Sequence, residues 1–310
     1  MLSWGNVYVS ISSHSVERTI QRRLLLGALV CAVLLIVCYL FLVGTSWGHQ
    51  IDDDAYFGRE TLTRKVIRLD SVMLDLVTKG TLLLVAVVLL LIAAVRRCTF
   101  VGVVALVGFG CAVVGAEVLK DALPWRALVP DDGFFERSFQ IGTYPSGHAT
   151  IGTALALSLI LVSSSRWRPW LAVAAGGMSS TFATGVLFAG WHRPSDALGA
   201  LAWAGLCMNL AAALAVRLQG RSRPTTVHPG CALCGSVGLG IVVAAASWLI
   251  AAAGAPEYPH GDLPFFVLTG LINAGAFSLT AWYGWQLRAV DWPTTRKHNA
   301  KPAFNRPASS

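Results

Sequence analysis

Eight long apolar segments constrain this chain of 310 residues more than any other feature of its sequence. They cover roughly residues 24–43, 77–95, 99–119, 148–165, 170–190, 196–216, 232–254 and 264–287. A helix of about 20 apolar residues is long enough to span the hydrocarbon core of a bilayer. The composition agrees, because 55% of the residues are hydrophobic and only 13% are charged, whereas soluble proteins carry about 25% charged residues. The sequence therefore predicts an all-α polytopic membrane protein.

The distribution of basic residues predicts the orientation of these spans. With residues 1–23 in the cytoplasm and eight alternating spans, the cytoplasmic segments hold 15 of the 24 basic residues but, of the acidic ones, only Glu17 and Asp291. The basic residues are Arg18, Arg22, Arg23, Arg96, Arg97, Arg166, Arg168, Arg217, Arg221, Arg223, Arg288, Arg296, Lys297, Lys301 and Arg306. Such an excess marks cytoplasmic loops, so the net charge of +8 follows from topology and needs no nucleic-acid partner. Residues 1–23 lack signal-peptide features, so the first apolar segment is expected to remain as a membrane helix.

Two short polar turns each place a histidine where an apolar segment begins. Residues 144–148 read Tyr-Pro-Ser-Gly-His, and residues 190–196 read Gly-Trp-His-Arg-Pro-Ser-Asp. Lys120 and Arg126 follow the end of another apolar segment. The eight-span arrangement puts these three groups on the outer face, together with the acidic loop 45–70. We therefore expect the two turns and the two cations to form one site at the outer membrane surface.

The residue types in these turns suit phosphate chemistry. A helix start presents unpaired N–H groups and a positive dipole end to an anion, and Gly147 lets the backbone approach closely. His192 and Asp196 are four residues apart, within contact distance if that turn is helical. A carboxylate on one imidazole nitrogen fixes the tautomer and leaves the other nitrogen free to attack. With His148 as proton donor to the leaving group, this inventory suits metal-free phosphoryl transfer through a phosphohistidine.

At these residues the chain resembles the type-2 phosphatidic acid phosphatase superfamily of membrane lipid phosphatases. Residues 145–148 match one family signature, Pro-Ser-Gly-His, completely. Residues 190–196 contain the second half of another signature, Ser-Arg-x5-His-x3-Asp. The resemblance covers about residues 24–217 and implies a six-helix phosphatase core; the last two apolar segments lie outside it and are expected to form two further membrane helices. The expected organisation is a cytoplasmic tail at 1–23, the core at 24–217, a cytoplasmic linker at 218–231, two additional transmembrane helices at 232–287 and a cytoplasmic tail at 288–310.

The chain departs from the family pattern at two places. The signature Lys-x6-Arg-Pro is altered, because five residues separate Lys120 from Arg126 and Ala127 replaces the proline. Residues 185–186 are Gly-Val where the family has Ser-Arg, so the family's third phosphate-binding cation is missing from its usual position. Arg193, directly after the histidine, is the expected substitute. Weaker substitutes in the outer loops are Arg137, Arg64, Lys65 and Arg68.

The resemblance implies a role for each matching residue. His192 is the expected nucleophile, Asp196 orients it, and His148 protonates the leaving oxygen. The residues expected to bind the phosphoryl group are Lys120, Arg126, Ser146, Gly147 and, provisionally, Arg193. No metal and no organic cofactor are implied. The expected reaction is hydrolysis of a lipid phosphate or diphosphate monoester, of the polyprenyl diphosphate, phosphatidate or phosphatidylglycerophosphate type, at the extracytoplasmic face of the plasma membrane, with both termini cytoplasmic.

Three other functions remain open at this point. A lipid phosphotransferase would use the same phosphohistidine but pass the phosphoryl group to an acceptor lipid. A catalytically impaired lipid-binding or scaffold protein is compatible with the Gly-Val replacement. A transporter ranks last, because the predicted spans are largely free of the mid-membrane charges and broken helices typical of that class. The sequence does not indicate an oligomeric state.

Some polar residues have simpler expected roles. Residues 52–54, Asp-Asp-Asp, could bind a divalent cation together with Glu60, but we expect them to belong to a solvated outer loop. His49 is expected to be an interfacial polar residue. Glu117, one turn before Lys120, is expected to neutralise that lysine or a helix neighbour.

Overall fold

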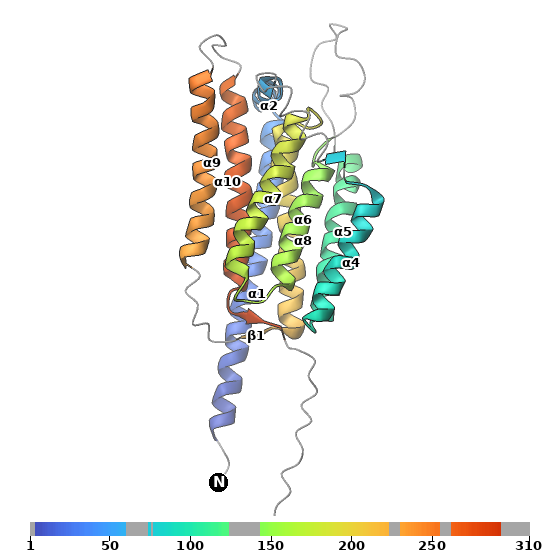
Figure 1. Cartoon of the computed structure of the whole chain (residues 1–310), viewed down its shortest axis with the longest axis vertical. Helices are drawn as coiled ribbons and strands as arrows, with labels where there is room; N and C mark the ends of the chain where they lie inside the picture. The colour runs from blue at the N-terminus through green and yellow to red at the C-terminus, as the bar shows by residue number, and fades with distance from the viewer. Residues whose placement is uncertain are drawn as a thin grey trace, which may run out of the picture.

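The chain forms a single bundle of long helices. The computed structural model describes residues 4–59, 74–75, 77–123, 143–222, 230–254 and 262–292. The helices are α1 (Trp4–Cys38), continued by the π-helical turn η1 (Tyr39–Val43), then α2 (Ser46–Gly58), α4 (Lys79–Val95), α5 (Thr99–Ala122), α6 (Gly147–Val162), α7 (Arg168–Phe188), α8 (Pro194–Gln219), α9 (Gly230–Gly254) and α10 (Asp262–Leu287). Two short strands, β1 (Arg221–Ser222) and β2 (Val290–Asp291), pair antiparallel at one end of the bundle. Figure 1 shows the helices running side by side, which confirms the predicted all-α class.

Each of the eight predicted apolar segments is helical over most of its length. Among the described residues, five helices are long and apolar enough to cross a membrane: Val16–Val43, Thr99–Ala122, Arg168–Phe188, Pro194–Gln219 and Leu263–Leu287. Three shorter apolar helices cover Gly80–Val95, Gly147–Val162 and Val237–Ala246. The 16 residues of α6 rise only about 24 Å, less than the hydrocarbon thickness of about 30 Å. The structure thus supports a multi-pass membrane protein, with five spans evident by length and composition.

The centre of the bundle is α8, which packs against α1, α5, α6 and α10. Small residues line its buried faces and allow close approach, as is typical of helices packed in lipid. The ring of Tyr144 rests directly on Gly199, where an added Cβ would lie 2.3 Å from Tyr144 Cε2. The Tyr144 hydroxyl also donates to the Leu35 carbonyl oxygen at 2.6 Å. The polar turn before α6 is therefore held between α1 and α8.

Arg168, one of the basic residues counted in the cytoplasmic charge excess, is buried and hydrogen-bonded inside the bundle. Arg168 has no exposed surface. Its guanidinium donates hydrogen bonds to the carbonyl oxygens of Leu287, Val290, Ser163 and Ile160. Because these carbonyls lie at the ends of α6 and α10, Arg168 ties the last helix to the middle of the chain. Its position still agrees with the predicted orientation, but its charge is satisfied by backbone oxygens and not by solvent.

The acidic stretch after the first span is not the solvated loop that the sequence predicted. Residues 46–58 form α2, a helix that lies across one end of the bundle (Figure 1). The Thr45 side chain caps it by accepting a hydrogen bond from Gly48 N at 3.0 Å. Ala55 and Tyr56 belong to a buried cluster with residues of α7, α8 and α10, and Asp52 is fully buried. The apolar residues among the acids give this segment a buried face, which explains why the expectation was wrong.

Candidate active site

A tight turn between α7 and α8 positions His192. Gly190 adopts φ +73°, a conformation that glycine reaches at little cost. The N–H groups of Trp191 and His192 both donate to the Val186 carbonyl oxygen, at 3.0 and 3.1 Å. Pro194 then opens α8 at a position where a missing N–H costs nothing. The turn therefore holds His192 at the N-terminal end of the central helix.

Asp196 binds the imidazole of His192. The distance between His192 Nδ1 and Asp196 Oδ2 is 3.1 Å, with 12% and 3% of the two side chains exposed. The same Oδ2 accepts a hydrogen bond from Arg193 N at 3.1 Å. The contact expected from the four-residue spacing is therefore present. A carboxylate that accepts the Nδ1 proton leaves the imidazole lone pair on Nε2, the arrangement a nucleophilic histidine needs.

The start of α6 lies next to the start of α8. Ser146 caps α6, with its side chain accepting from Ala149 N at 3.5 Å, and its own N–H donates to the Asp196 carbonyl oxygen at 3.0 Å. The His148 ring packs edge-on against Trp191, with ring centroids 5.2 Å apart. His148 is also close enough to His192 for their charges to interact. Two histidines that are 44 positions apart in the sequence thus meet at one end of the bundle.

Lys120 reaches the same helix start from α5. A Cβ added at Gly147 would lie 3.2 Å from Lys120 Nζ and 2.8 Å from Glu117 Oε1. Lys120 Nζ also donates to Glu117 Oε1 at 2.8 Å, so the predicted neutralising contact is confirmed. The absence of a side chain at Gly147 lets the ammonium group lie over the first turn of α6. A cation and free helix N–H groups therefore face the same small volume.

Arg193 points toward α2. Its Nε donates to Asp53 Oδ1 at 2.6 Å, and its side chain is largely buried. The guanidinium charge is consequently shared with a carboxylate, whereas the sequence prediction had assigned it to phosphate alone. Arg126 lies outside the described residues, as do the weaker substitutes Arg137, Arg64, Lys65 and Arg68.

The sequence reading missed the contribution of α2 to this region. Asp52 accepts hydrogen bonds from both polar groups of Ser195: the backbone N at 2.8 Å and Oγ at 2.5 Å. Burial raises the pKa of Asp52 to about 7, although the Ser195 hydrogen bonds act in the opposite direction. His49, expected to be interfacial, is buried and lies 3.6 Å from Asp53 through Nε2. The one signal in the sequence was the predicted placement of the acidic stretch on the same face as the histidines.

The end of α2 also braces the turn before His192. The Tyr56 hydroxyl donates to the Gly190 carbonyl oxygen at 2.8 Å. The Arg59 guanidinium stacks over the Tyr56 ring, with 3.7 Å between its Cζ and the ring centroid. Arg59 packs so closely on Gly190 that an added Cβ would lie 2.7 Å from its Nε. Glycine at 190 is thus required by its backbone conformation, and the Arg59 side chain packs against it.

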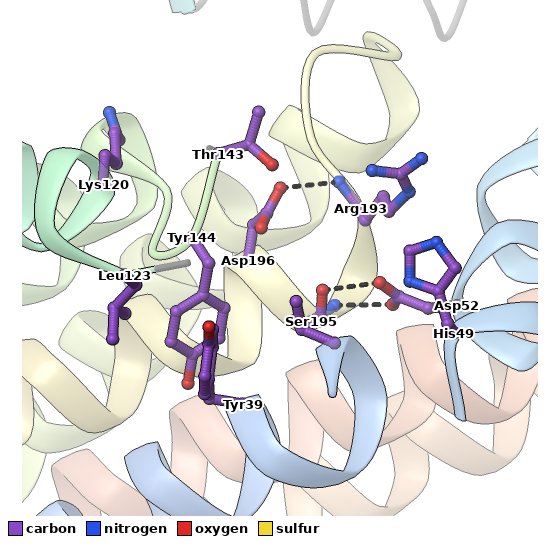
Figure 2. Close-up of a pocket in the computed structure, with 11 residues that line it drawn as sticks. Tyr39, His49, Asp52, Lys120, Leu123, Thr143, Tyr144, Arg193, Ser195 and Asp196 are labelled. Carbon is purple, nitrogen blue, oxygen red and sulfur yellow. Dashed lines mark hydrogen bonds between the residues drawn. The ribbon is translucent and has the colours of Figure 1, made fainter. Parts of the chain in front are cut away.

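A polar pocket lies where these elements meet, and Figure 2 shows it. The residues that line it are Tyr39, Val43, His49, Asp52, Lys120, Leu123, Thr143, Tyr144, Arg193, Ser195 and Asp196. Asp196 both lines the pocket and holds the His192 imidazole. The pocket therefore brings cations, carboxylates and hydroxyl groups together, and Asp196 links it to the histidine.

Comparison with known proteins identifies the segment that carries this site. Residues 98–221 match the family model of the PAP2 superfamily. This segment is similar to the PAP2 superfamily and makes up about two fifths of the chain. No curated protein and no solved structure matches the chain. The PAP2 segment contains Lys120, both histidines and Asp196, whereas α2 and α10 lie outside it. The match over this segment and the apolar helices together support a phosphatase embedded in the membrane.

Proposed function

We propose that this protein hydrolyses a lipid phosphate or diphosphate monoester through a phosphohistidine on His192. The observation that carries the proposal is the 3.1 Å contact between His192 Nδ1 and Asp196 Oδ2 beside the Lys120-covered start of α6. This arrangement provides a nucleophile, its orienting carboxylate and an anion site in one place. Both termini are assigned to the cytoplasm and the site to the extracytoplasmic face of the plasma membrane, in keeping with the charge distribution.

In the first step, His192 Nε2 attacks the phosphorus atom of the substrate. A P–N bond forms while the P–O bond to the leaving group breaks. His148 gives its proton to the departing oxygen. The leaving group is then the lipid alcohol when the substrate is a monophosphate, and the lipid monophosphate when the substrate is a diphosphate. Asp196 stabilises the positive charge that develops on the His192 ring.

In the second step, a water molecule replaces the leaving group. His148 takes a proton from the water, whose oxygen attacks phosphorus while the P–N bond breaks. Inorganic phosphate is released and both histidines return to their starting states. The residues proposed to hold the phosphoryl oxygens are Lys120, Arg126, Ser146, the Gly147 N–H and Arg193. Such preorganised donors act most strongly on charge that develops in the transition state.

The test is phosphate release by the purified protein in detergent with EDTA, from a panel of lipid phosphates. We expect release that His192→Ala abolishes and that Asp196→Asn lowers about 10⁴-fold, as when a catalytic histidine loses the carboxylate that orients it. Asp54→Asn is the matched control, because Asp54 is an exposed carboxylate on α2. Equal activity in His192→Ala and wild type would refute the assignment of the nucleophile.

A labelled substrate separates hydrolysis from its alternatives. In the wild-type protein, ³²P from the substrate should appear transiently on the protein and then as inorganic phosphate. Transfer of the label to an added acceptor lipid instead would establish a phosphotransferase. Lipid binding without release of the label from any substrate would establish the impaired binding protein.

A further inference from the structure

A second pocket lies at the end of the bundle opposite the candidate active site. One face of α1, residues 16–23, and residues 286–289 at the end of α10 form it, and its volume is about 220 Å³. That is the volume of about seven water molecules, at about 30 Å³ each. Its polar lining includes Arg23, Arg288 and Gln286. This basic pocket is therefore large enough for a phosphate group.

The length of the bundle separates the basic pocket from His192. The central helix α8 begins directly after the His192 turn, and its 26 residues rise about 39 Å, more than the hydrocarbon thickness of about 30 Å. Strand β1 closely follows α8 and pairs with β2, which directly follows Ala289 of the basic pocket. Figure 1 shows α2 and β1 at opposite ends of the bundle. The basic pocket thus lies at the end assigned to the cytoplasm.

Two arginines concentrate positive charge in the basic pocket. The Cζ atoms of Arg288 and Arg23 lie 4.2 and 5.1 Å from the centre of the Trp285 ring, so both guanidinium groups lie against one indole. Burial lowers the pKa of Arg288, and the nearby charge of Arg23 lowers it further. Within the described part of the chain, neither arginine forms an ion pair, and no carboxylate lines the pocket. A bound anion would relieve the repulsion between the two arginines.

A buried amide without partners also lines the basic pocket. Only 1% of Gln286 is exposed, and neither its Nε2 nor its Oε1 has a hydrogen-bond partner among the described residues. Its Nε2 lies against α1, because a Cβ added at Gly27, one turn after Arg23, would lie 2.9 Å from it. Buried polar groups are normally hydrogen-bonded, to protein, water or a ligand. The amide offers a donor for a phosphate oxygen and an acceptor for a hydroxyl group.

The surroundings of the basic pocket are those of a membrane interface. Trp285 stacks on Trp282, with ring centroids 5.1 Å apart, and tryptophan is enriched at the level of the lipid headgroups. Leu26 and Val30 follow Arg23 by three and seven residues, which places them near the same side of α1. They are 54% and 50% exposed. A phosphate in the pocket can therefore be joined to acyl chains that lie along α1.

We propose that the basic pocket binds the phosphate of an anionic glycerophospholipid with a hydroxyl-bearing headgroup, of the phosphatidylglycerol type, from the adjoining leaflet. Arg23 and Arg288 bind the phosphate oxygens, for which guanidinium geometry is well suited, and Gln286 binds the headgroup. Basic pockets between membrane helices at the cytoplasmic side commonly hold anionic headgroups. Because α1 and α10 both lie outside the PAP2 segment, this site belongs to the part of the chain that the family match does not cover.

The test is thermal unfolding of the purified protein in a neutral detergent with dioctanoyl phosphatidylglycerol or dioctanoyl phosphatidylcholine. A ligand at 100 times its Kd raises the Tm of a 310-residue chain by about 4 °C. We expect a saturable rise of this size with phosphatidylglycerol and a much smaller one with the zwitterionic lipid. Equal rises with both lipids would overturn the proposal.

Arg288→Gln removes one charge from the basic pocket. Its matched control is Arg22→Gln, which removes an exposed charge from the same part of α1 without touching the pocket. We expect Arg288→Gln to raise the Kd for phosphatidylglycerol by about 10-fold or more, the loss expected for one hydrogen bond to a charged group. Arg22→Gln should leave the Kd within about 2-fold. Equal losses would indicate diffuse attraction to the basic surface and refute a built site.

Gln286→Leu separates lipid binding from a structural role. It removes a buried amide that has no protein partner, so the Tm of the lipid-free protein should stay the same or rise. The Kd for phosphatidylglycerol should nevertheless rise by about 10-fold. Native mass spectrometry of the protein with both lipids gives a second measure of binding that does not depend on unfolding. An unchanged Kd in Gln286→Leu would contradict the proposed contact.

Inorganic phosphate distinguishes a lipid site from a site for a free anion. In place of the lipid, it should raise Tm far less, because it lacks the acyl chains. A rise that equals that of phosphatidylglycerol and is lost in Arg288→Gln would assign the basic pocket to free phosphate and overturn the lipid assignment. None of these measurements uses phosphate release, so they decide the basic pocket whether or not the protein is a phosphatase.

Discussion

Asp52 provides the sharpest test of how α2 supports the site. Its carboxylate is fully buried and accepts both hydrogen bonds of Ser195, which itself has 1% of its surface exposed. Asp52→Ala leaves the Ser195 N–H and O–H without their acceptor. Each unsatisfied buried donor costs about 1–3 kcal/mol, so the two together cost about 2–6 kcal/mol.

Relief of carboxylate desolvation offsets part of that loss. We therefore expect Asp52→Ala to lower the free energy of unfolding by about 3 kcal/mol, which corresponds to a drop in Tm of about 5 °C for a chain of 310 residues, since the unfolding entropy is about 2.1 cal/mol/K per residue. Asp52→Asn should cost about 1 kcal/mol or less, because its amide oxygen can accept from Ser195 N and its NH₂ can donate to Ser195 Oγ. The assay is thermal unfolding in a mild detergent at fixed pH.

The same residue predicts a dependence of stability on pH. Burial raises the pKa of Asp52 from 3.8 to about 7 in the folded protein. Between these two values the folded state holds a proton that the unfolded state has lost, so stability must fall as pH rises from about 4 to about 7. Asp52→Asn cannot titrate and should lose less stability over that range than the wild type does. An equal slope in both proteins would contradict the raised pKa.

Asp54→Ala is the control for the substitution itself. Asp54 lies two residues further along α2 and is exposed, so its removal should change the free energy of unfolding by about 0.5 kcal/mol or less. The reasoning would be refuted if Asp52→Ala and Asp54→Ala gave the same Tm. That result would mean that α2 does not hold the start of α8 through Ser195.

Two further predictions concern arginines. Arg193→Ala should lower kcat/KM for the lipid phosphate by about 10²- to 10³-fold if the charge of Arg193 acts on the phosphoryl group. Asp53→Asn keeps that charge and should have a smaller effect on kcat/KM. Similarly small effects of both substitutions would show that Arg193 has a structural role only. Arg168→Ala should lower the free energy of unfolding by about 4 kcal/mol or more, because four backbone carbonyl oxygens lose their donor and each unsatisfied buried polar group costs about 1–3 kcal/mol. The exposed neighbour Arg166→Ala should leave Tm almost unchanged, and comparable Tm values for the two variants would refute the anchoring role of Arg168.

The helices and their approximate limits were predictable from the amino-acid sequence. Apolar segments of membrane length predicted 99–119 and 170–190, and the structure places helices at Thr99–Ala122 and Arg168–Phe188. These limits are local, because a polar or proline-containing junction ends each apolar run. The contact between His192 and Asp196 was predictable for the same reason, since a four-residue spacing at a helix start brings two side chains together.

The surroundings of that contact depend on how the helices pack together. Asp52 carries no sequence signal that separates a buried hydrogen-bonded carboxylate from a solvated one, because the distinction depends on Ser195, 143 positions away. The sequence pattern around Arg168 is typical of an exposed charge in a cytoplasmic loop. In the folded protein, however, its guanidinium donates hydrogen bonds to backbone carbonyl oxygens of other segments. The basic pocket likewise exists only where α1 meets the end of α10. Local patterns determine which residues become helical and which neighbours on one helix touch, whereas burial and pairing between helices depend on how the whole chain packs.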